Sequence, residues 1–142
     1  MPAKVKSYRL IDTHCSDTGN GCLWMFQYGG KNSVLPFAIK KVLVVSGMKP
    51  DDVRGLHAHR KTTELVVAIQ GGCEVEIDDG KKKSVVQVRG PKKALLLAPQ
   101  TWRTLRKFEK NTIILIIADT LYTERDYIRN YDDFLQMVGK KR

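Results

Sequence analysis

Short runs of apolar residues, each ended by a turn signal, follow one another along most of this chain. Stretches 37–45, 64–69 and 112–120 are rich in β-branched and aliphatic residues, and stretch 73–77 alternates apolar with polar residues. Alternation is typical of a strand with one buried and one solvated face. Together with weaker runs at 8–11, 23–26, 84–88, 94–98 and 102–108, and a hairpin signal at Asp79-Gly80, the pattern predicts roughly eight to ten strands. No helical period separates these strands, so we expect an all-β fold, an antiparallel sandwich or barrel.

Only the C-terminal stretch changes to a helical period. Its large apolar residues recur at positions 127, 128, 131, 134, 135 and 138. Thr123, with Asp126 three residues later, resembles a capping box. We therefore predict a helix over about 123–138 that closes one end of the sheet structure. The length of 142 residues fits a single domain, spanning residues 1–142.

Composition narrows the class of protein. Hydrophobic residues make up 42% of the chain and charged residues 28%, as in ordinary globular domains. The longest aliphatic run, 113–118, is too short to span a bilayer, and no signal-peptide pattern precedes it. An odd count of three cysteines (Cys15, Cys22 and Cys73) predicts reduced thiols, with Cys73 in the core. We therefore expect a cytoplasmic protein with no membrane partner.

The formal net charge of +10 invites a nucleic-acid partner, but its distribution argues against one. Both halves of the chain carry the same net charge, and the basic blocks 81–83 and 140–142 lie at a turn and at a terminus. A nucleic-acid-binding protein usually carries a basic stripe or aromatic residues interleaved with its cations. We expect no nucleic acid. The positive excess suits a small polyanion such as a nucleotide diphosphate, which it would steer toward the protein.

The strongest candidate for chemistry is the stretch Arg-Gly-Leu-His-Ala-His over residues 54–59, followed by Glu64. Alternate residues of a strand point to the same face, so His57 and His59 direct two imidazoles into one space. Imidazole is the commonest metal ligand and also the side chain that titrates nearest neutral pH. The motif therefore allows a metal site or an acid/base pair. A purely structural pair of strand histidines is the third interpretation.

The spacing His57-x-His59-x4-Glu64-x6-Gly71 resembles the first metal motif of cupins, which are double-stranded β-helix (jelly-roll) barrels. In cupins a second motif supplies a fourth ligand, and the matching position here is Arg103. Arginine stays protonated and has no lone pair to give, so we expect no metal. A buried carboxylate is costly unless it is paired. We therefore predict a Glu64–Arg103 salt bridge, which leaves His57 and His59 free for proton transfer.

An ordered set of motifs over residues 34–138 carries a resemblance to a known family. The motifs are Pro-Phe-Ala-Ile-Lys-Lys at 36–41, Arg-Gly-Leu-His-Ala-His-Arg at 54–60, Asp-Asp-Gly at 78–80, Pro-x-x-Trp at 99–102 and a Tyr/Asp/Arg pattern over 122–134. They resemble the sugar 3,4-ketoisomerases of the cupin superfamily. Those enzymes act on dTDP-4-keto-6-deoxyglucose in the biosynthesis of 3-amino-3,6-dideoxyhexoses.

The resemblance implies a cupin barrel with a short C-terminal helix that works without metal or cofactor. It also implies a homodimer that exchanges its N-terminal strands, within residues 7–30. The reaction moves a carbonyl from C4 to C3 of the dTDP-linked hexose through an enediol. We assign His57 as the carbon base and His59 as its partner, with the two roles open to reversal. His59 or Arg103 would stabilise the enolate.

The resemblance also implies substrate-binding residues. Arg54 is the candidate for the diphosphate, since a guanidinium suits phosphate oxygens; a structural salt bridge is its alternative. Lys40, Tyr127 and Trp102 are candidates for nucleotide contact, with core packing as the alternative for Trp102. Asn20 stands where the family residue helps, together with the one at Arg103, to set which face of C4 is protonated. The product configuration at C4 and the nucleotide stay open, and Glu64 replaces a glutamine that is common in the family.

Two other functions compete with this one. A metal-dependent cupin enzyme, a dioxygenase or isomerase, would use His57, His59 and Glu64 as ligands. A non-catalytic sugar-nucleotide binding module would need neither histidine for its function.

Overall fold

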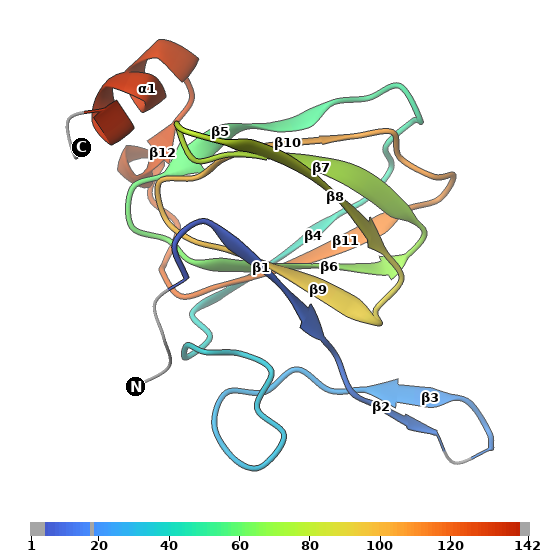
Figure 1. Cartoon of the computed structure of the whole chain (residues 1–142). Helices are drawn as coiled ribbons and strands as arrows, with labels where there is room; N and C mark the ends of the chain where they lie inside the picture. Colours follow the sequence, from blue (N-terminus) through green and yellow to red (C-terminus); the bar gives the residue numbers. More distant parts are fainter. Residues whose placement is uncertain (1–4, 18, 140–142) are drawn as a thin grey trace.

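Two five-stranded antiparallel sheets face each other in the computed structural model of the chain, which describes residues 5–17 and 19–139 (Figure 1). The strand orders are β1-β9-β6-β11-β4 and β12-β5-β10-β7-β8, and strands β2 and β3 form a separate hairpin. The strands are β1 (Tyr8–Asp12), β2 (Cys15–Asp17), β3 (Cys22–Trp24), β4 (Lys41–Val45), β5 (Arg54–His59), β6 (Glu64–Gln70), β7 (Gly72–Asp78), β8 (Lys83–Arg89), β9 (Lys93–Leu97), β10 (Trp102–Arg106), β11 (Ile113–Ala118) and β12 (Tyr127–Ile128). The predicted all-β fold is confirmed.

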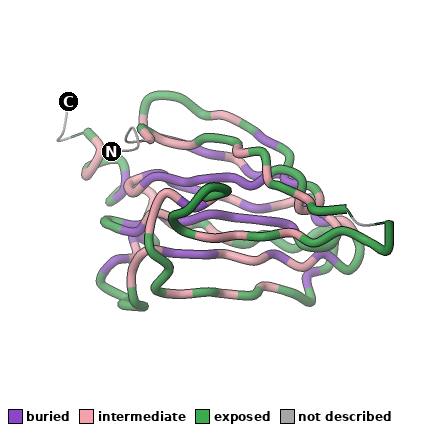
Figure 2. The backbone as a smooth tube through the Cα atoms, turned by 90° about the horizontal axis from the view of Figure 1, so that it is seen from below, coloured by how far each residue is buried: buried purple, intermediate pink, exposed green. Residues whose placement is uncertain are grey.

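The central strand β6 is apolar on both faces because both faces are covered. Val66 and Ala68 point into the core between the sheets, while Leu65 and Val67 pack under the N-terminal segment with Leu35. Strands buried on two sides read as continuous apolar runs. Figure 2 shows the buried residues concentrated along the middle of the strands, with exposed residues in the connecting loops.

Strand β7 keeps the alternation that its sequence predicts. Val75 and Ile77 are fully buried in the core. On the other face, Glu74 and Glu76 form ion pairs with Arg106 of the neighbouring strand β10. The hairpin from β7 to β8 turns at Gly80, which has a positive φ of 90°, as the Asp-Gly signal predicts.

The predicted start of the C-terminal helix is wrong. Residues Glu124–Asp126 form a short 3-10 helix (η1), β12 follows, and the helix α1 runs only over Tyr131–Gly139. Thr123 stands at the N-cap of η1 but makes no side-chain cap bond. The periodic aromatic residues belong partly to β12, which pairs with β5. Helix α1 does close one end of the barrel, because Phe134 is fully buried against Trp102 and Ile128.

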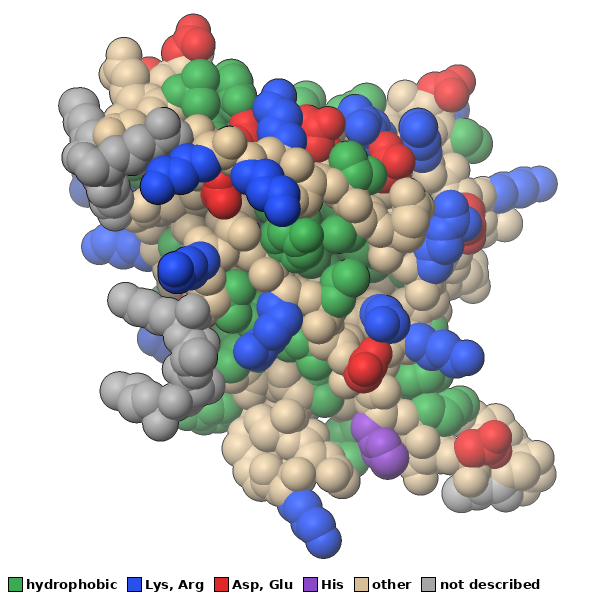
Figure 3. All heavy atoms as spheres, in the orientation of Figure 1, with side chains coloured by type: hydrophobic (Ala, Val, Ile, Leu, Met, Phe, Trp, Pro, Cys, Tyr) green, Lys and Arg blue, Asp and Glu red, His purple; other side chains and the backbone are tan. Residues whose placement is uncertain are grey.

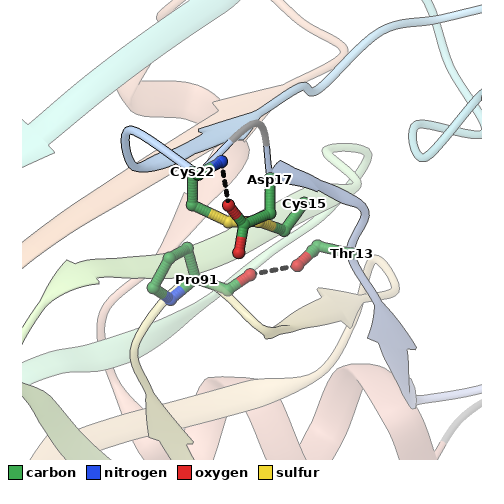
Figure 4. The surroundings of a disulfide bond; sticks show 6 residues. Thr13, Cys15, Asp17, Cys22 and Pro91 are labelled. Carbon is green, nitrogen blue, oxygen red and sulfur yellow. Dashed lines mark hydrogen bonds between the residues drawn. A yellow bond between two sulfur atoms is a disulfide. The ribbon is translucent and has the colours of Figure 1, made fainter.

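The prediction of three reduced cysteines is also wrong. Cys15 and Cys22 form a disulfide across the β2–β3 hairpin (Figure 4). The spacing of seven residues carries no framework signal, and only the antiparallel pairing of two very short strands brings the thiols together. Just before this hairpin, the Thr13 hydroxyl donates a hydrogen bond to the Pro91 carbonyl and ties the segment to the barrel. Cys73 is free and buried in the core, as predicted.

Positive charge on the face drawn in Figure 3 lies in separate groups. On the face drawn in Figure 3, lysine and arginine side chains are spread out, with aspartate or glutamate beside several of them. Within residues 5–17 and 19–139, no helix is long and apolar enough to cross a membrane.

Candidate active site

A cavity of about 390 Å³ opens between the two sheets. One side is apolar and comes mainly from β4, β6 and β11. The other side carries the charged and titratable groups, from β5, β6, β10, β12 and the segment just after β12. These polar lining residues are Arg54, His57, Glu64, Arg103, Tyr127 and Arg129. An apolar pocket with a few convergent polar groups is the usual form of a small-molecule site.

A bulge in β5 brings Arg54 and His57 to the same cavity. Gly55 and Leu56 both have positive φ values, 83° and 55°, and the register with β10 shifts at this point. In a regular strand, Arg54 and His57 would point to opposite faces. The extra residue re-aims one of them, which is a common use of bulges near active sites. Both side chains therefore line the cavity.

Glu64 and Arg103 form the predicted salt bridge. An Arg103 Nη1 donates to Glu64 Oε1, and both side chains are only 3% exposed. Burial alone would raise the pKa of Glu64, but the Arg103 charge and a contact from His59 overcome it and lower the pKa to about 2. Glu64 is therefore ionised at neutral pH. Arg103 also donates to the Thr101 carbonyl at 3.1 Å, which holds the guanidinium in place.

His57 presents an unprotonated nitrogen to the cavity. Its Nδ1 lies 3.0 Å from the Gly55 carbonyl oxygen, which can only accept, so Nδ1 carries the proton. Burial, and next the positive charge of Arg103, lower the pKa of His57 to about 4, against weaker contributions from the Gly55 carbonyl and Glu64. At neutral pH the imidazole is uncharged, and its Nε2 holds a lone pair. This is the state that a general base requires.

His59 is buried behind His57 and bound by a residue that the sequence patterns missed. Its Nδ1 lies 2.8 Å from Asp126 Oδ2, and its Nε2 lies 3.4 Å from Glu64 Oε1. The two imidazole rings meet edge to face, with centroids 4.9 Å apart. His59 does not itself line the cavity. It therefore supports His57 from within the barrel wall.

Asp126 is held as a hydrogen-bond acceptor. It accepts from the Thr62 hydroxyl, and from the Lys61 amide at 2.7 Å. Burial pushes the pKa of Asp126 up, but the bonds from Thr62 and Lys61, with that of His59, hold it below its usual value. The only sequence signal was its place in the motif over 122–134, where we interpreted it as a helix cap. The carboxylate instead fixes the His59 proton on Nδ1.

Tyr127 joins the two histidines to the rim of the cavity. Its ring centroid lies 5.0 Å from that of His57 and 4.4 Å from that of His59. The Arg129 guanidinium lies over the Tyr127 ring, 4.3 Å from its centroid. Burial raises the pKa of Tyr127, so its phenol stays protonated at neutral pH. Tyr127 lines the cavity, as expected of a substrate contact.

Three predicted binding residues lie outside the cavity lining. Lys40 is exposed, and its amide donates to the Ala118 carbonyl. Trp102 is buried against Tyr131 and Phe134, so core packing is its role in the structure. Asn20 sits on the β2–β3 hairpin, which projects away from the barrel (Figure 1). Within one chain these three are not brought to the site.

The donor set of a cupin metal site is present, but its surroundings do not fit a divalent cation. One donor atom each from His57, His59 and Glu64 lie within 4.8 Å of one another. Glu64 is already paired with Arg103, whose permanent positive charge lines the same cavity. A guanidinium beside the donors repels a metal ion and gives no fourth ligand. The site therefore does not suit a divalent metal ion.

Comparisons with known proteins show what the whole chain is similar to. The sequence family described as "FdtA: WxcM-like, C-terminal" matches residues 4–139. A TDP-4-oxo-6-deoxy-alpha-D-glucose-3,4-oxoisomerase from Aneurinibacillus thermoaerophilus is 33% identical over 110 residues, which cover 78% of this chain and 79% of that protein.

Two solved structures are similar over nearly the whole chain. A 3,4-ketoisomerase from Helicobacter canadensis has a TM-score of 0.87 and 30% identity, covering 93% of this chain and 97% of its own. A histidine-to-asparagine mutant of the 3,4-ketoisomerase QdtA from Thermoanaerobacterium thermosaccharolyticum, in complex with TDP-4-keto-6-deoxyglucose, has a TM-score of 0.89 and 25% identity. It covers 96% of this chain and 97% of its own. The barrel is thus of the predicted cupin type.

Proposed function

From the premise that the chain belongs to the FdtA (WxcM-like, C-terminal) family, whose similar relatives are 3,4-ketoisomerases, we propose its substrate and mechanism. The protein converts dTDP-4-keto-6-deoxyglucose to a dTDP-3-keto-6-deoxyhexose. The observation that carries this proposal is the neutral imidazole of His57, which faces a cavity already lined by fixed cations.

The reaction needs only proton transfers. The C4 ketone acidifies the proton on C3, which His57 Nε2 removes while the electron pair moves onto the C4 oxygen. The resulting enediolate is stabilised by Arg103, a preorganised cation of the cavity wall. Transfer of the hydroxyl proton and return of a proton to C4 leave the carbonyl at C3. Atoms and electrons balance without a redox cofactor.

His59 acts on the reaction through His57. The Asp126 carboxylate holds the His59 ring, and the ring holds the edge of His57. The protonated phenol of Tyr127 lies against both imidazoles and can donate a hydrogen bond to the substrate. The apolar wall opposite suits the 6-deoxy methyl group of the hexose. Arg54 would contact the diphosphate at the same cavity.

The protein would act as a homodimer in the cytoplasm. The β2–β3 hairpin, with Asn20 on it, projects from the barrel, and an exchange of N-terminal strands would lay it on the second copy. Such an exchange would bring Asn20 toward the site of the second copy, as its proposed role requires. Cys15 and Cys22 both lie on this arm.

Proton exchange tests the proposal directly. The protein is incubated with dTDP-4-keto-6-deoxyglucose in D₂O, and deuterium at C3 and C4 is followed by NMR. We expect exchange at C3 and a 3-keto product, and a loss of about 10²- to 10⁴-fold in kcat for His57→Asn. His14→Asn, on the exposed segment between β1 and β2, is the matched control. If the unmodified protein shows no deuterium exchange at C3 or C4 and forms no 3-keto product, the assignment is rejected.

The two competing functions make different predictions. A metal-dependent cupin would purify with stoichiometric metal and lose activity with a chelator. Against this, the Arg103 guanidinium already pairs with Glu64, so its charge opposes a metal ion at the same carboxylate. A binding module would retain its function in His57→Asn and His59→Asn variants. Metal analysis and the exchange assay on these proteins separate all three.

A further inference from the structure

Arg129 stands at the edge of the cavity with a carboxylate partner that no catalytic step uses. The residue follows β12 directly and lines the cavity. Its Nε donates to Glu124 Oε1 at 2.6 Å and one Nη2 donates to Glu124 Oε2 at 3.2 Å. The Tyr122 hydroxyl donates to the same carboxylate at 2.8 Å. The pair is bidentate, and a guanidinium binds a phosphate with the same geometry.

The Arg129–Glu124 pair is exposed, so it separates at low cost. Arg129 is 53% and Glu124 is 60% exposed, and exposed ion pairs contribute little to stability. Glu124 is ionised at neutral pH, because the bonds first from Arg129 and then from Tyr122 lower its pKa to about 2. A diphosphate brings more negative charge to the guanidinium than one carboxylate does.

Arg129 is also connected to the catalytic groups through Tyr127. Its guanidinium stacks on the Tyr127 ring, which in turn contacts both imidazoles. Arg54, from the β5 bulge, lines the same cavity. Two guanidinium groups at one cavity that also holds apolar walls fit a ligand with an anionic part and a less polar part.

We propose that Arg129 binds the diphosphate of the nucleotide sugar and that Glu124 occupies Arg129 when the site is empty. Ligand entry exchanges the Glu124 carboxylate for a phosphate, and the stacked Tyr127 keeps the guanidinium in place during the exchange. Glu124 therefore lowers the affinity for the nucleotide and speeds its release. This inference rests on the proposed function, because it takes the ligand to be a nucleoside diphosphate sugar.

The test is a double-mutant cycle read by calorimetric binding of dTDP. Glu124→Gln removes the competitor, and we expect Kd to fall about two- to fivefold, the measured range for one exposed ion pair. Arg129→Gln removes the phosphate contact, and we expect Kd to rise by about tenfold or more. In the Arg129→Gln background, Glu124→Gln should change Kd by less than in the unmodified protein. That coupling distinguishes competition for Arg129 from a general effect of negative charge.

The chain offers a matched control. Glu109→Gln removes one carboxylate from another exposed pair, Arg89–Glu109, which lies outside the cavity lining, and should leave dTDP binding unchanged. Equal effects of Glu124→Gln in both backgrounds, or an unchanged Kd in Arg129→Gln, would overturn the inference while the isomerase assay still supports the function. Failure of the unmodified protein to bind dTDP would reject the nucleotide ligand itself, and the inference with it.

Discussion

At the residue scale, the site depends on which nitrogen of each histidine carries the proton. A carbonyl oxygen fixes the proton of His57 on Nδ1, and a carboxylate does the same for His59. The two rings nevertheless differ, because only His57 faces the cavity. The Gly55 carbonyl and the Asp126 carboxylate thus set the proton position on each ring. Of the two rings, His57 is the candidate base and His59 supports it.

The low pKa of His57 predicts a loss of stability in acid. The unfolded histidine binds a proton near pH 6.5, whereas the folded one does so only near pH 4. Between these values the unfolded state holds more protons, so the free energy of unfolding falls as the pH falls and levels off below about 4. The melting temperature, measured by circular dichroism, should fall less between pH 7 and pH 4 for His57→Asn than for the unmodified protein. Parallel curves for the two proteins would contradict the buried, neutral state of His57.

Asp126→Asn should impair catalysis more than stability. An amide places an NH₂ group where Oδ2 accepts from His59 and Thr62, so the His59 proton must move to Nε2. We expect kcat to fall about 10- to 100-fold, the range found for residues that orient a metal-bound histidine in other proteins. The ¹⁵N signal of the His59 ring should change as well. Asp119→Asn is the control, because Asp119 lies in the same loop and accepts the Thr63 amide, at 2.9 Å. An unaltered ¹⁵N pattern, or an equal loss in the control, would show that Asp126 only holds the loop.

At the element scale, the bulge in β5 is the feature that makes the site. Periodicity placed His57 and His59 on a strand, and the sequence also identified Arg54 and the Glu64–Arg103 pair. The same periodicity would have put Arg54 and His57 on opposite faces. Only the positive φ values of Gly55 and Leu56 bring the two together. A local rule of alternation cannot foresee a bulge, which depends on the register with a distant strand.

Gly55→Ala should therefore distort the site. A Cβ at this position would lie 2.8 Å from the Arg103 carbonyl oxygen, and the backbone φ of 83° is itself strained for alanine. Gly47→Ala is the matched control, because its φ of 81° is nearly the same and a Cβ there meets nothing within 4 Å. Left-handed alanine costs about 1–2 kcal/mol. We expect the Gly55 variant to lose more stability than the control in urea denaturation and to lose activity as well. Equal losses would mean that the close approach to Arg103 is unimportant.

At the scale of the whole molecule, the pattern of apolar residues predicts the long strands of the barrel but not the short elements around them. Apolar runs predicted nearly every long strand, because burial on one or two faces leaves a clear pattern. The pattern failed at the short elements: the β2–β3 disulfide hairpin, η1 and β12. Such elements are fixed by contacts with distant strands, as Asp126 is by His59 and Thr62.

The two sheets end in very different edge strands, and this difference predicts where a second copy binds. On β4, Val42 and Val44 are 53% and 63% exposed, side by side on one face. On β8, the edge of the other sheet, the exposed Val85 stands among charged and polar side chains, which is how proteins protect an edge. A contiguous apolar edge is typical of an interface.

Val44→Lys should therefore weaken the proposed homodimer. A lysine in an apolar interface must lose its hydration without a partner, so the dimer becomes less stable. We expect the unmodified protein to sediment at twice its chain mass of 16.1 kDa and the variant to shift toward the mass of one chain. Val85→Lys places the same charge on the opposite edge and should leave the mass unchanged, while circular dichroism checks that all three proteins are folded. A dimer that tolerates Val44→Lys would place the interface away from β4, and a monomeric unmodified protein would remove the exchanged arm from the account altogether.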